Sequence, residues 1–481
     1  MVKKYKEIII LIASFTLIRL LVAPTFGLGV DEAHYALYAR YLDWSYVDHP
    51  PLVGWVHALF SSLFGMNEFT VRLPAIILFV FVSWFAYQFM LEISDSKTVA
   101  LIAALALNCS FLLNAMSLML LPDCFLMFLI FPLIFVTRKI EMEGGWRFFL
   151  YLGVTFGLAG LAKYTAILLV PPFIVYFLLK KRYDILFSPW MFLAAAIALL
   201  LIWPVIYWNL KNDFISFHYQ MNHVLGSRRV RLQCLLTAIT SQAGFYSPFL
   251  FAVSLYGLYK SFKAKEDLIR LSLLFGGTIL AFFLYSSLRE PALPHWSCIF
   301  YILFIPLGTY FLLMDGGCRK RNFLYLCIGF SLIVTLFLYA ELSAKWIRFP
   351  DYKSPFQDIY GYPAIAEEAN AIWKQNPNPK KAVAVTNWTM ASRVIYYAFP
   401  YHYPVFVVDQ RDDQFDFWEK KLPAGYDLLF LNSHFHAKDI PRIFQCDRAA
   451  SVKKIDIMLN GGKVDSIEYI WCYNFQGWKD K

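Results

Sequence analysis

The chain has 481 residues, of which 59% are hydrophobic, 19% are aromatic and only 16% are charged. Soluble domains are about 45–50% apolar and about 25% charged, so this composition excludes a disordered protein, a coiled coil and an ordinary soluble enzyme. The net charge of +10 falls in short clusters between apolar runs, a pattern typical of membrane topology rather than of nucleic-acid binding.

Apolar runs dominate the first two thirds of the chain. A membrane-spanning helix needs about 20 mostly apolar residues, and about eleven runs approach this length. They lie near 8–22, 73–91, 99–113, 115–136, 148–161, 166–179, 189–208, 234–258, 271–288, 294–313 and 323–339. The sequence therefore predicts an all-α membrane fold, a polytopic bundle of about eleven transmembrane helices, over residues 1–341.

Basic residues predict the orientation of this bundle. If the lysine-rich N-terminus is cytoplasmic, every loop expected on the same side is also basic, as the positive-inside rule requires. These loops contain Lys97, Arg138, Lys139, Arg147, Lys180, Lys181, Arg182, Lys260, Lys263, Lys265, Arg319, Lys320 and Arg321. One outer loop departs from the rule with Arg228, Arg229 and Arg231, which makes that loop a candidate anion site.

The composition changes after Glu341. Short apolar runs there are typical of strands, and two amphipathic runs between them are typical of helices. The strands are expected at 382–385, 405–408 and 428–431, and the helices at 365–373 and 390–397. This alternation predicts a small α/β domain over residues 342–481, which an odd number of spans would place in the periplasm.

Two of the eight cysteines, Cys446 and Cys472, lie in this polar C-terminal part. They could form a disulfide if the domain faces an oxidising compartment, but the sequence does not give the geometry that pairing requires.

An acidic segment at 29–51, GVDEAHYALYARYLDWSYVDHPP, follows the first span on the predicted outer side. Asp31 and Glu32 fall in the first turn of a helix-compatible run. One interpretation is that they cap this helix and complement its dipole. The segment is unusually rich in acids, histidines and aromatics, however, and the topology brings other polar residues to the same side. We therefore favour a chemical role.

The other polar residues expected at the outer face include two at the ends of spans. Ionisable groups at membrane depth are costly and tend to be functional. Asp123 is too short to reach far towards water, so we favour function for it. Lys163 fits snorkelling equally well, and Arg19 fits snorkelling better than phosphate binding. The remaining outer residues are Tyr164, Asn209, Asp213, Ser216, His218, His223, Arg289, Glu290 and His295.

This set of residues suits one kind of chemistry. Carboxylates can deprotonate a hydroxyl or amine nucleophile. Arginine, lysine and histidine can stabilise a phosphate leaving group. Because nucleotide sugars are not supplied outside the cytoplasm, a sugar on a lipid-linked phosphate is the donor that such a site would use.

Several short motifs follow one another along nearly the whole chain. They are Asp31-Glu32, DHPPLVGW (48–55), LFGMNEFTVRLP (63–74), LPD (121–123), GLAGLAKYTAILLVP (157–171), WNLKNDFISF (208–217), EPALPHW (290–296), TNWTMASRVIYY (386–397) and DQRDDQFDFW (409–418). In this order and spacing they resemble the polytopic type C glycosyltransferase superfamily of protein O-mannosyltransferases and aminoarabinose (lipid A) transferases, in particular a bacterial envelope subgroup.

The resemblance implies an integral-membrane, inverting glycosyltransferase that moves a hexosyl or pentosyl unit from a polyprenyl-phosphate donor. It implies that Asp31 is the base or the acceptor-orienting carboxylate, that Glu32 supports it, and that Asp123 is a second essential acid. It further suggests donor-phosphate ligands (Lys163, Arg289, His49, Arg228 and Arg229) and substrate or acceptor contacts (His34, Tyr35, His218 and His295).

Two departures concern the sugar. The lipid A transferases usually carry a basic residue after the acidic pair and Lys before the double proline, where this chain has His34 and His49. The charge of histidine depends on pH. Aminoarabinose is therefore disfavoured, and the sugar stays open.

The predicted function is sugar transfer to an envelope glycolipid, lipid A or its core, at the periplasmic side of the bacterial inner membrane. The alternatives are protein O-glycosylation, a lipid-linked sugar transporter or flippase, and a non-catalytic envelope assembly protein or receptor. A transporter would hold its polar residues near the bilayer midplane, often in repeats. The transferase prediction requires Asp31 and Asp123 to line one cavity.

The expected partners are the polyprenyl-phosphate sugar, a lipid A, core or protein acceptor, and membrane lipids, with no nucleic acid. No cofactor and no metal site is predicted, because Asp31, Glu32 and His34 supply few oxygen ligands. A divalent cation is left open.

Overall fold

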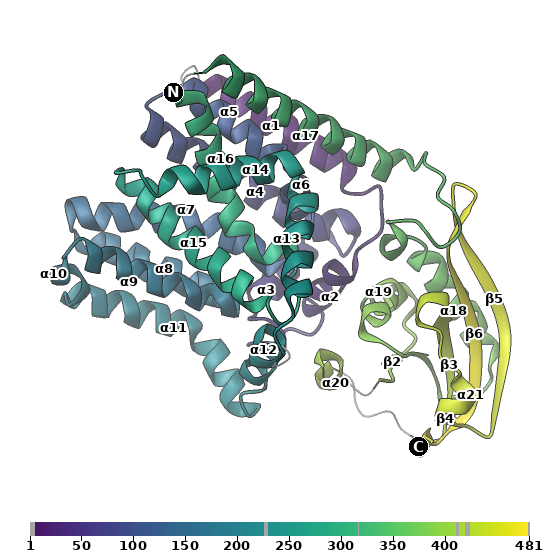
Figure 1. The fold of residues 1–481 in the computed structure, drawn as a ribbon. Helices are drawn as coiled ribbons and strands as arrows, with labels where there is room; N and C mark the ends of the chain where they lie inside the picture. The colour runs from purple at the N-terminus through teal and green to yellow at the C-terminus, as the bar shows by residue number, and fades with distance from the viewer. Residues whose placement is uncertain (1–4, 226–228, 316, 410–412, 419–423, 480–481) are drawn as a thin grey trace. The chain divides into compact units, whose positions relative to one another are not determined.

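The computed structural model describes residues 5–225, 229–315, 317–409, 413–418 and 424–479, with the backbone alone for 222–225 (Figure 1). The chain divides into two compact units. The helical unit comprises Met1–Ala23, Asp43–Val56 and Arg72–Tyr339. The sheet unit comprises Pro24–Leu42, His57–Val71 and Ala340–Lys481.

Helices make up almost all of the helical unit. They are α1 Lys6–Val22, α4 Glu68–Ser94, α5 Lys97–Asn108, α6 Phe111–Met116, α7 Pro122–Glu143, α8 Trp146–Ala162, η2 Tyr164–Leu169, α9 Val170–Leu179, α10 Tyr183–Leu186, α11 Pro189–Lys211, α12 Ile215–Leu225, α13 Leu232–Tyr246, α14 Pro248–Ser261, α15 Asp267–Ser286, η3 Pro294–Ser297, α16 Cys298–Met314 and α17 Cys318–Ala344. Helix α3, Leu52–Phe64, contributes residues to both units, as do α4 and α17.

Five helices in the described part of the chain are long and apolar enough to cross a membrane: Glu68–Ser94, Pro189–Lys211, Asp267–Ser286, Pro294–Met314 and Cys318–Ala344. Shorter apolar helices occupy several of the other predicted runs. The prediction of an apolar helical bundle followed by a small domain with a sheet is confirmed. The predicted count of eleven spans is not.

Some predicted spans are interrupted. The run 234–258 was expected to be one helix but forms α13 and α14, so this prediction was wrong. Ser247 between them has a φ of +81°, outside the helical region, and Pro248 begins the next helix. The run 115–136 is interrupted too, because α6 ends at Met116 and α7 begins at Pro122.

Helices α8 and α11 pack closely because glycines line the face of α8 that meets α11. A Cβ atom at Gly153 would lie 2.6 Å from the carbonyl oxygen of Ala194, and one at Gly157 would lie 2.6 Å from Leu201 Cδ1. Small residues are the usual means by which membrane helices approach each other. This packing fixes α8, which ends at Ala162, directly before the candidate site residue Lys163.

The sheet unit alternates helices and strands before it ends in strands. Its elements are α2 Val30–Tyr38, η4 Gln357–Ile359, α18 Tyr362–Gln375, β1 Lys381–Val385, α19 Trp388–Ala398, η5 Phe399–Tyr401, β2 Val405–Val407, α20 Gln414–Trp418, β3 Tyr426–Ser433, η6 His434–His436, α21 Ile440–Ile443, β4 Phe444–Gln445, β5 Arg448–Leu459, β6 Gly462–Phe475 and β7 Gly477–Trp478. The predicted strands and helices of this part are therefore present.

The five-stranded sheet has the order β2-β1-β3-β6-β5. Strand β1 is parallel to β2 and β3, whereas β6 is antiparallel to β3 and β5. The sequence analysis missed the long β5–β6 hairpin. Asn460 and Gly461, both with positive φ, form the tight turn between these strands.

One face of the sheet carries a hydrophobic core that includes Val383, Leu429 and Val394 of α19. Ala33 and Leu37 of α2 belong to the same core. The acidic segment after α1 therefore packs with C-terminal residues. The domain limits 1–341 and 342–481 remain a sequence prediction.

Cys446 and Cys472 form a disulfide, with their Cα atoms 5.5 Å apart. This bond links Cys446, the residue after β4, to strand β6 and settles the pairing that the sequence left open.

Candidate functional site

A buried ion pair joins Asp123 to Lys163. The Lys163 Nζ atom donates to both carboxylate oxygens of Asp123 at 2.7 Å. The Asp123 and Lys163 side chains are only 4% and 7% exposed. Asp123 lies in the first turn of α7, and Lys163 follows α8, where the backbone becomes extended. Lys163 therefore does not snorkel, because its ammonium group ends at a carboxylate.

Two further predicted residues accompany this pair. His295 and His49 lie close enough to act electrostatically on the Asp123 carboxylate. The Lys163 ammonium lies 5.9 Å from the ring centre of Trp296, next to His295 in η3. Three of these predicted site residues thus lie at the start of α7, directly after α8 and in η3, and the fourth, His49, lies in the segment before α3. Removing either partner of such a pair as Asp123–Lys163 would leave a buried, uncompensated charge.

Helices α11 and α12 hold the segment that leads to His49. The indole nitrogen of Trp208 donates to Asp43 Oδ2 at 2.8 Å. Ser216 Oγ donates to the Tyr46 carbonyl at 2.9 Å. Gln220 Nε2 donates to the Asp48 carbonyl at 2.6 Å. The sequence analysis did not assign these positioning roles. The motif WNLKNDFISF, which contains Trp208 and Ser216, was the signal that could have revealed them.

The arginines that were predicted to bind an anion are not part of this ion pair. Arg289 donates from Nη2 to Tyr285 Oη at 2.9 Å, and its Nη1 is buried without a hydrogen-bond partner in the part of the chain that the structure describes. Arg231 Nη2 donates to the Arg289 carbonyl at 2.9 Å. Arg229 is exposed, whereas Arg228 and the side chain of His223 lie outside the described residues.

His218, a predicted substrate contact, is exposed on α12. The structure gives it no position beside Asp123, so its role stays a prediction.

In the sheet unit, Glu32 caps its own helix. Its Oε2 accepts a hydrogen bond from the Gly29 backbone nitrogen at 2.9 Å, and the residue is 1% exposed. The capping interpretation thus holds for Glu32, which fixes the start of α2. Its supporting role beside Asp31 stays a prediction. Asp31 is half-buried in the same turn. Its role as the base stays a prediction.

His34 lies in an aromatic cluster. Its ring centre is 5.3–5.8 Å from those of Tyr38, Trp388, Phe415 and Trp418. Tyr35 packs against His34 at 5.7 Å. Both residues are buried, so the structure shows a packing role, and their predicted contact with substrate stays a prediction.

The two predicted acids belong to different units: Asp31 to the sheet unit and Asp123 to the helical unit. Their convergence in one cavity is therefore a prediction still to be tested. In the described residues no group of three or more His, Cys, Asp or Glu side chains could hold a metal ion. A divalent cation likewise stays untested.

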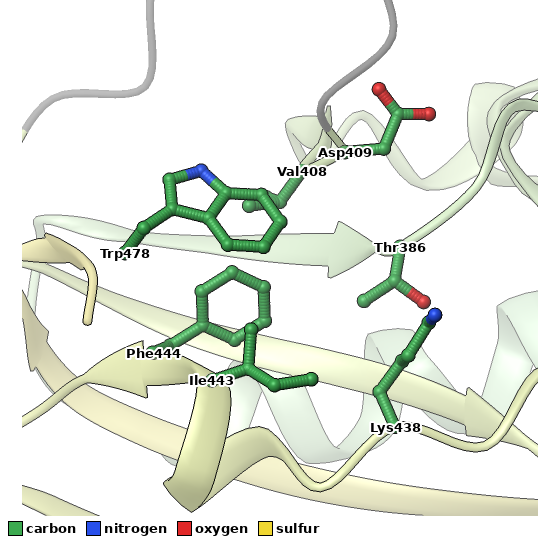
Figure 2. Close-up of a pocket in the computed structure, with 7 residues that line it drawn as sticks. All are labelled: Thr386, Val408, Asp409, Lys438, Ile443, Phe444 and Trp478. Atoms are coloured by element: carbon green, nitrogen blue, oxygen red, sulfur yellow. The ribbon is translucent and has the colours of Figure 1, made fainter. Parts of the chain in front are cut away.

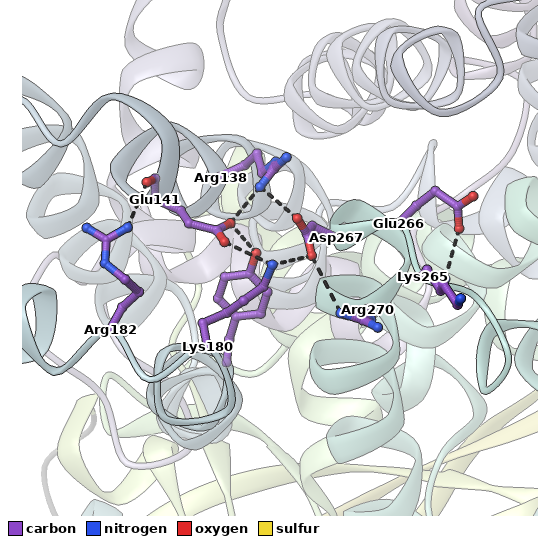
Figure 3. Close-up of polar contacts among 9 residues, drawn as sticks. Arg138, Glu141, Lys180, Arg182, Lys265, Glu266, Asp267 and Arg270 are labelled. Carbon is purple, nitrogen blue, oxygen red and sulfur yellow. Dashed lines mark hydrogen bonds and ion pairs between the residues drawn. The ribbon is translucent and has the colours of Figure 1, made fainter.

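A second charged cluster lies at the other end of α7 (Figure 3). Arg138 pairs with Glu141 at 2.7 Å and with Asp267 at 2.8 Å, and Lys180 pairs with the same two acids. Arg138 follows Asp123 by fifteen positions, which is about 22 Å along a helix. The cluster ties the C-terminal part of α7 to the start of α15 and to the end of α9.

Residues 48–208 match the family described as dolichyl-phosphate-mannose-protein mannosyltransferase. The lipid A galacturonosyltransferase RgtD of Rhizobium johnstonii is 23% identical over 360 residues, which cover 72% of this chain and 73% of that protein.

Two solved structures share the fold over nearly the full length. ArnT from Cupriavidus metallidurans bound to undecaprenyl phosphate superposes with a TM-score of 0.67 at 14% identity, covering 96% of this chain and 97% of that one. The apo state of the same protein gives a TM-score of 0.63 at 13% identity, with the same coverage.

The matched family segment contains Asp123, Lys163, His49 and Trp208, so it spans most of the residues that build the ion-pair site. Together with the curated relative and the shared fold, this match confirms the predicted resemblance of the chain to the polytopic type C glycosyltransferases.

Proposed function

We propose that this protein is a glycosyltransferase of the bacterial inner membrane that moves a sugar from a polyprenyl-phosphate carrier to lipid A or its core on the periplasmic side. The observation that carries the proposal is the buried Asp123–Lys163 pair, flanked by His49 and His295, inside the matched family segment. The acceptor follows from the lipid A galacturonosyltransferase relative, and the carrier from the fold of ArnT bound to undecaprenyl phosphate.

The reaction that we propose is an inverting displacement. An acceptor oxygen attacks the anomeric carbon, the bond from that carbon to the phosphate oxygen breaks, and the phosphate leaves on its lipid. The acceptor proton goes to a carboxylate, for which Asp31 is our choice. Lys163 would meet the charge that develops on the departing phosphate. A cation already fixed by Asp123 in a buried site needs little reorganisation to do so.

The proposed orientation rests on two features. Disulfides persist mainly in oxidising compartments, so the Cys446–Cys472 bond favours a periplasmic sheet unit. The loops around Arg138 and Lys180 are basic, which favours the cytoplasm for the far end of α7.

Transfer to protein is the second candidate, because the matching family is described by a protein mannosyltransferase activity. The curated relative acts on lipid A and matches a larger part of the chain than the family segment does, so we place lipid A first.

Mass spectrometry of lipid A and core oligosaccharide tests the proposal. Cells that lack the protein, or that carry Asp31→Asn or Asp123→Asn, should lose one sugar-sized mass that wild-type cells contain. Asp184→Asn is the matched control, because Asp184 is exposed and pairs with Arg182 outside the site. Membrane levels of each variant are compared by immunoblot.

An unchanged glycolipid in the deletion strain would refute the lipid A acceptor. In that case the loss of a sugar from envelope glycoproteins would identify the protein acceptor instead, whereas unchanged glycoproteins would refute the transferase itself.

A further inference from the structure

The sheet unit contains a pocket at the carboxyl ends of its parallel strands (Figure 2). The pocket has a volume of about 220 Å³. It is lined by Thr386, Val408, Asp409, Lys438, Ile443, Phe444 and Trp478. None of these residues takes part in the ion-pair site of the helical unit.

The position of the pocket is the one that α/β sheets use for ligands. Thr386 directly follows β1, and Asp409 lies two residues beyond the end of β2. The chain runs from β1 to β2 at the sheet edge and then returns to place β3 on the other side of β1. Ligands of open parallel sheets bind at the carboxyl ends of the strands beside such a reversal.

The apolar wall of the pocket consists of Ile443, Phe444 and Trp478, and backbone pairing between β4 and β7 holds it in place. Strands β4 and β7 pair Phe444 with Trp478, whose ring centres lie 4.6 Å apart. The Lys479 backbone nitrogen donates to the Ile443 carbonyl at 2.9 Å. The disulfide at Cys446, two residues after Phe444, anchors the same ribbon to β6. The aromatic wall is therefore formed before any ligand arrives.

The polar edge faces this wall. Lys438 lies in the loop after β3, where its backbone nitrogen donates to Asn432 Oδ1 at 2.8 Å and its carbonyl accepts from Asn432 Nδ2 at 3.0 Å. Figure 2 shows Lys438 and Thr386 on one side of the pocket and Trp478 and Phe444 on the other, with the Asp409 carboxylate pointing away from Phe444. The lining thus offers one cation, one hydroxyl and one carboxylate in addition to an indole ring.

We propose that this pocket binds a single monosaccharide unit that carries an anionic substituent, a phosphate or a carboxylate. The Trp478 ring offers an apolar surface to the C–H face of a pyranose, Lys438 offers a charge to the anion, and Asp409 can accept hydrogen bonds from hydroxyls. The volume is below the roughly 300–1,000 Å³ of sites for drug-sized ligands, which limits the occupant to about one ring. Such units occur in glycolipid headgroups and as free sugars.

Saturation-transfer NMR on the full-length protein in nanodiscs tests the proposal. The probes are galacturonate, glucose 6-phosphate and neutral glucose, with inorganic phosphate as a competitor. We expect signals from the two anionic sugars, at least a fivefold loss of signal in Trp478→Ala, and a reduction to the glucose level in Lys438→Gln. Phe435→Ala, an exposed aromatic outside the pocket, should leave the signals unchanged.

Nanodiscs that contain lipid A distinguish the sources. Displacement of galacturonate by lipid A would identify a glycolipid headgroup, whereas no displacement would identify a free anionic sugar. The absence of a signal from both anionic sugars would overturn the proposal. A signal retained in Lys438→Gln, or full displacement by inorganic phosphate at equal concentration, would overturn it as well. Lys438 is exposed, so that variant should fold even if Trp478→Ala does not. Binding is measured without turnover, so a failure here leaves the transferase proposal standing.

Discussion

At the scale of single residues, Asp123 and Lys163 depend on each other. Replacing one partner leaves a buried, uncompensated charge, which typically costs about 3–5 kcal/mol. We therefore expect Asp123→Asn and Lys163→Met each to lower the thermal unfolding temperature of the detergent-solubilised protein and to abolish sugar transfer. The double variant removes both charges, so it should recover most of the lost stability.

Activity separates a structural role from a chemical one in this experiment. If the pair only stabilised the fold, the stable double variant would regain transfer. We expect it to stay inactive, because neither carboxylate nor ammonium remains. Recovery of transfer in the double variant would remove both residues from the proposed chemistry.

A second residue-scale prediction concerns pH. Burial raises the pKa of Asp413 to about 6, and the nearby charges of Asp409 and Asp416 also raise it. A hydrogen bond from the Phe415 backbone and the charge of His34 act in the opposite direction. Because the folded state keeps a proton that the unfolded state has already released, stability should fall as pH rises from about 4 to about 6. In Asp413→Asn this decline should be smaller.

Chemical unfolding followed at several pH values between 4 and 7 measures this slope. Asp184→Asn, at an exposed position, serves as the control and should keep the wild-type slope. An equal slope in Asp413→Asn and the wild type would show that Asp413 does not titrate in this range.

At the scale of elements, the contact between α8 and α11 carries a prediction. A methyl group at Gly153 would press on the Ala194 backbone, so Gly153→Ala should destabilise the protein by about 1–3 kcal/mol through overpacking. Gly277→Ala in α15 is the matched control, because its nearest neighbour would be 4.0 Å away. Thermal unfolding of both variants decides the matter. If the two variants unfolded at the same temperature, α8 and α11 would be able to accommodate the extra methyl group without loss of stability.

Some helices and strands could be located from the sequence, and others could not. Apolar runs gave the positions of most helices, but the break at Ser247 depends on a backbone conformation that hydropathy does not report. Strands β1 and β3 were predicted because they are buried on both faces. Strand β5 was missed because it is an edge strand with exposed lysines such as Lys453 and Lys454. Its turn, Asn460-Gly461, was the available signal.

For the candidate site, the sequence predicts which residues take part but not how they contact one another. Asp123, Lys163, His49 and His295 could all be chosen from the sequence, because each lies in a motif or at the end of an apolar run. The direct bond between Asp123 and Lys163 could not be predicted, since it depends on how far each helix is rotated about its axis. The hydrogen bond from Trp208 to Asp43 likewise arises only when segments distant in the sequence meet.

At the scale of the whole molecule, the proposed mechanism uses two carboxylates that are far apart in the sequence, Asp31 and Asp123. Asp31 and Asp123 should act on the same transferred sugar, so their effects on turnover should not add. We expect Asp31→Asn and Asp123→Asn each to reduce transfer by a similar large factor, and the double variant to be no slower than the slower single variant. Transfer is measured with purified protein, a polyprenyl-phosphate sugar and lipid A. Effects that multiply in the double variant would show that the two residues act independently, and full activity of Asp31→Asn would remove Asp31 from the chemistry.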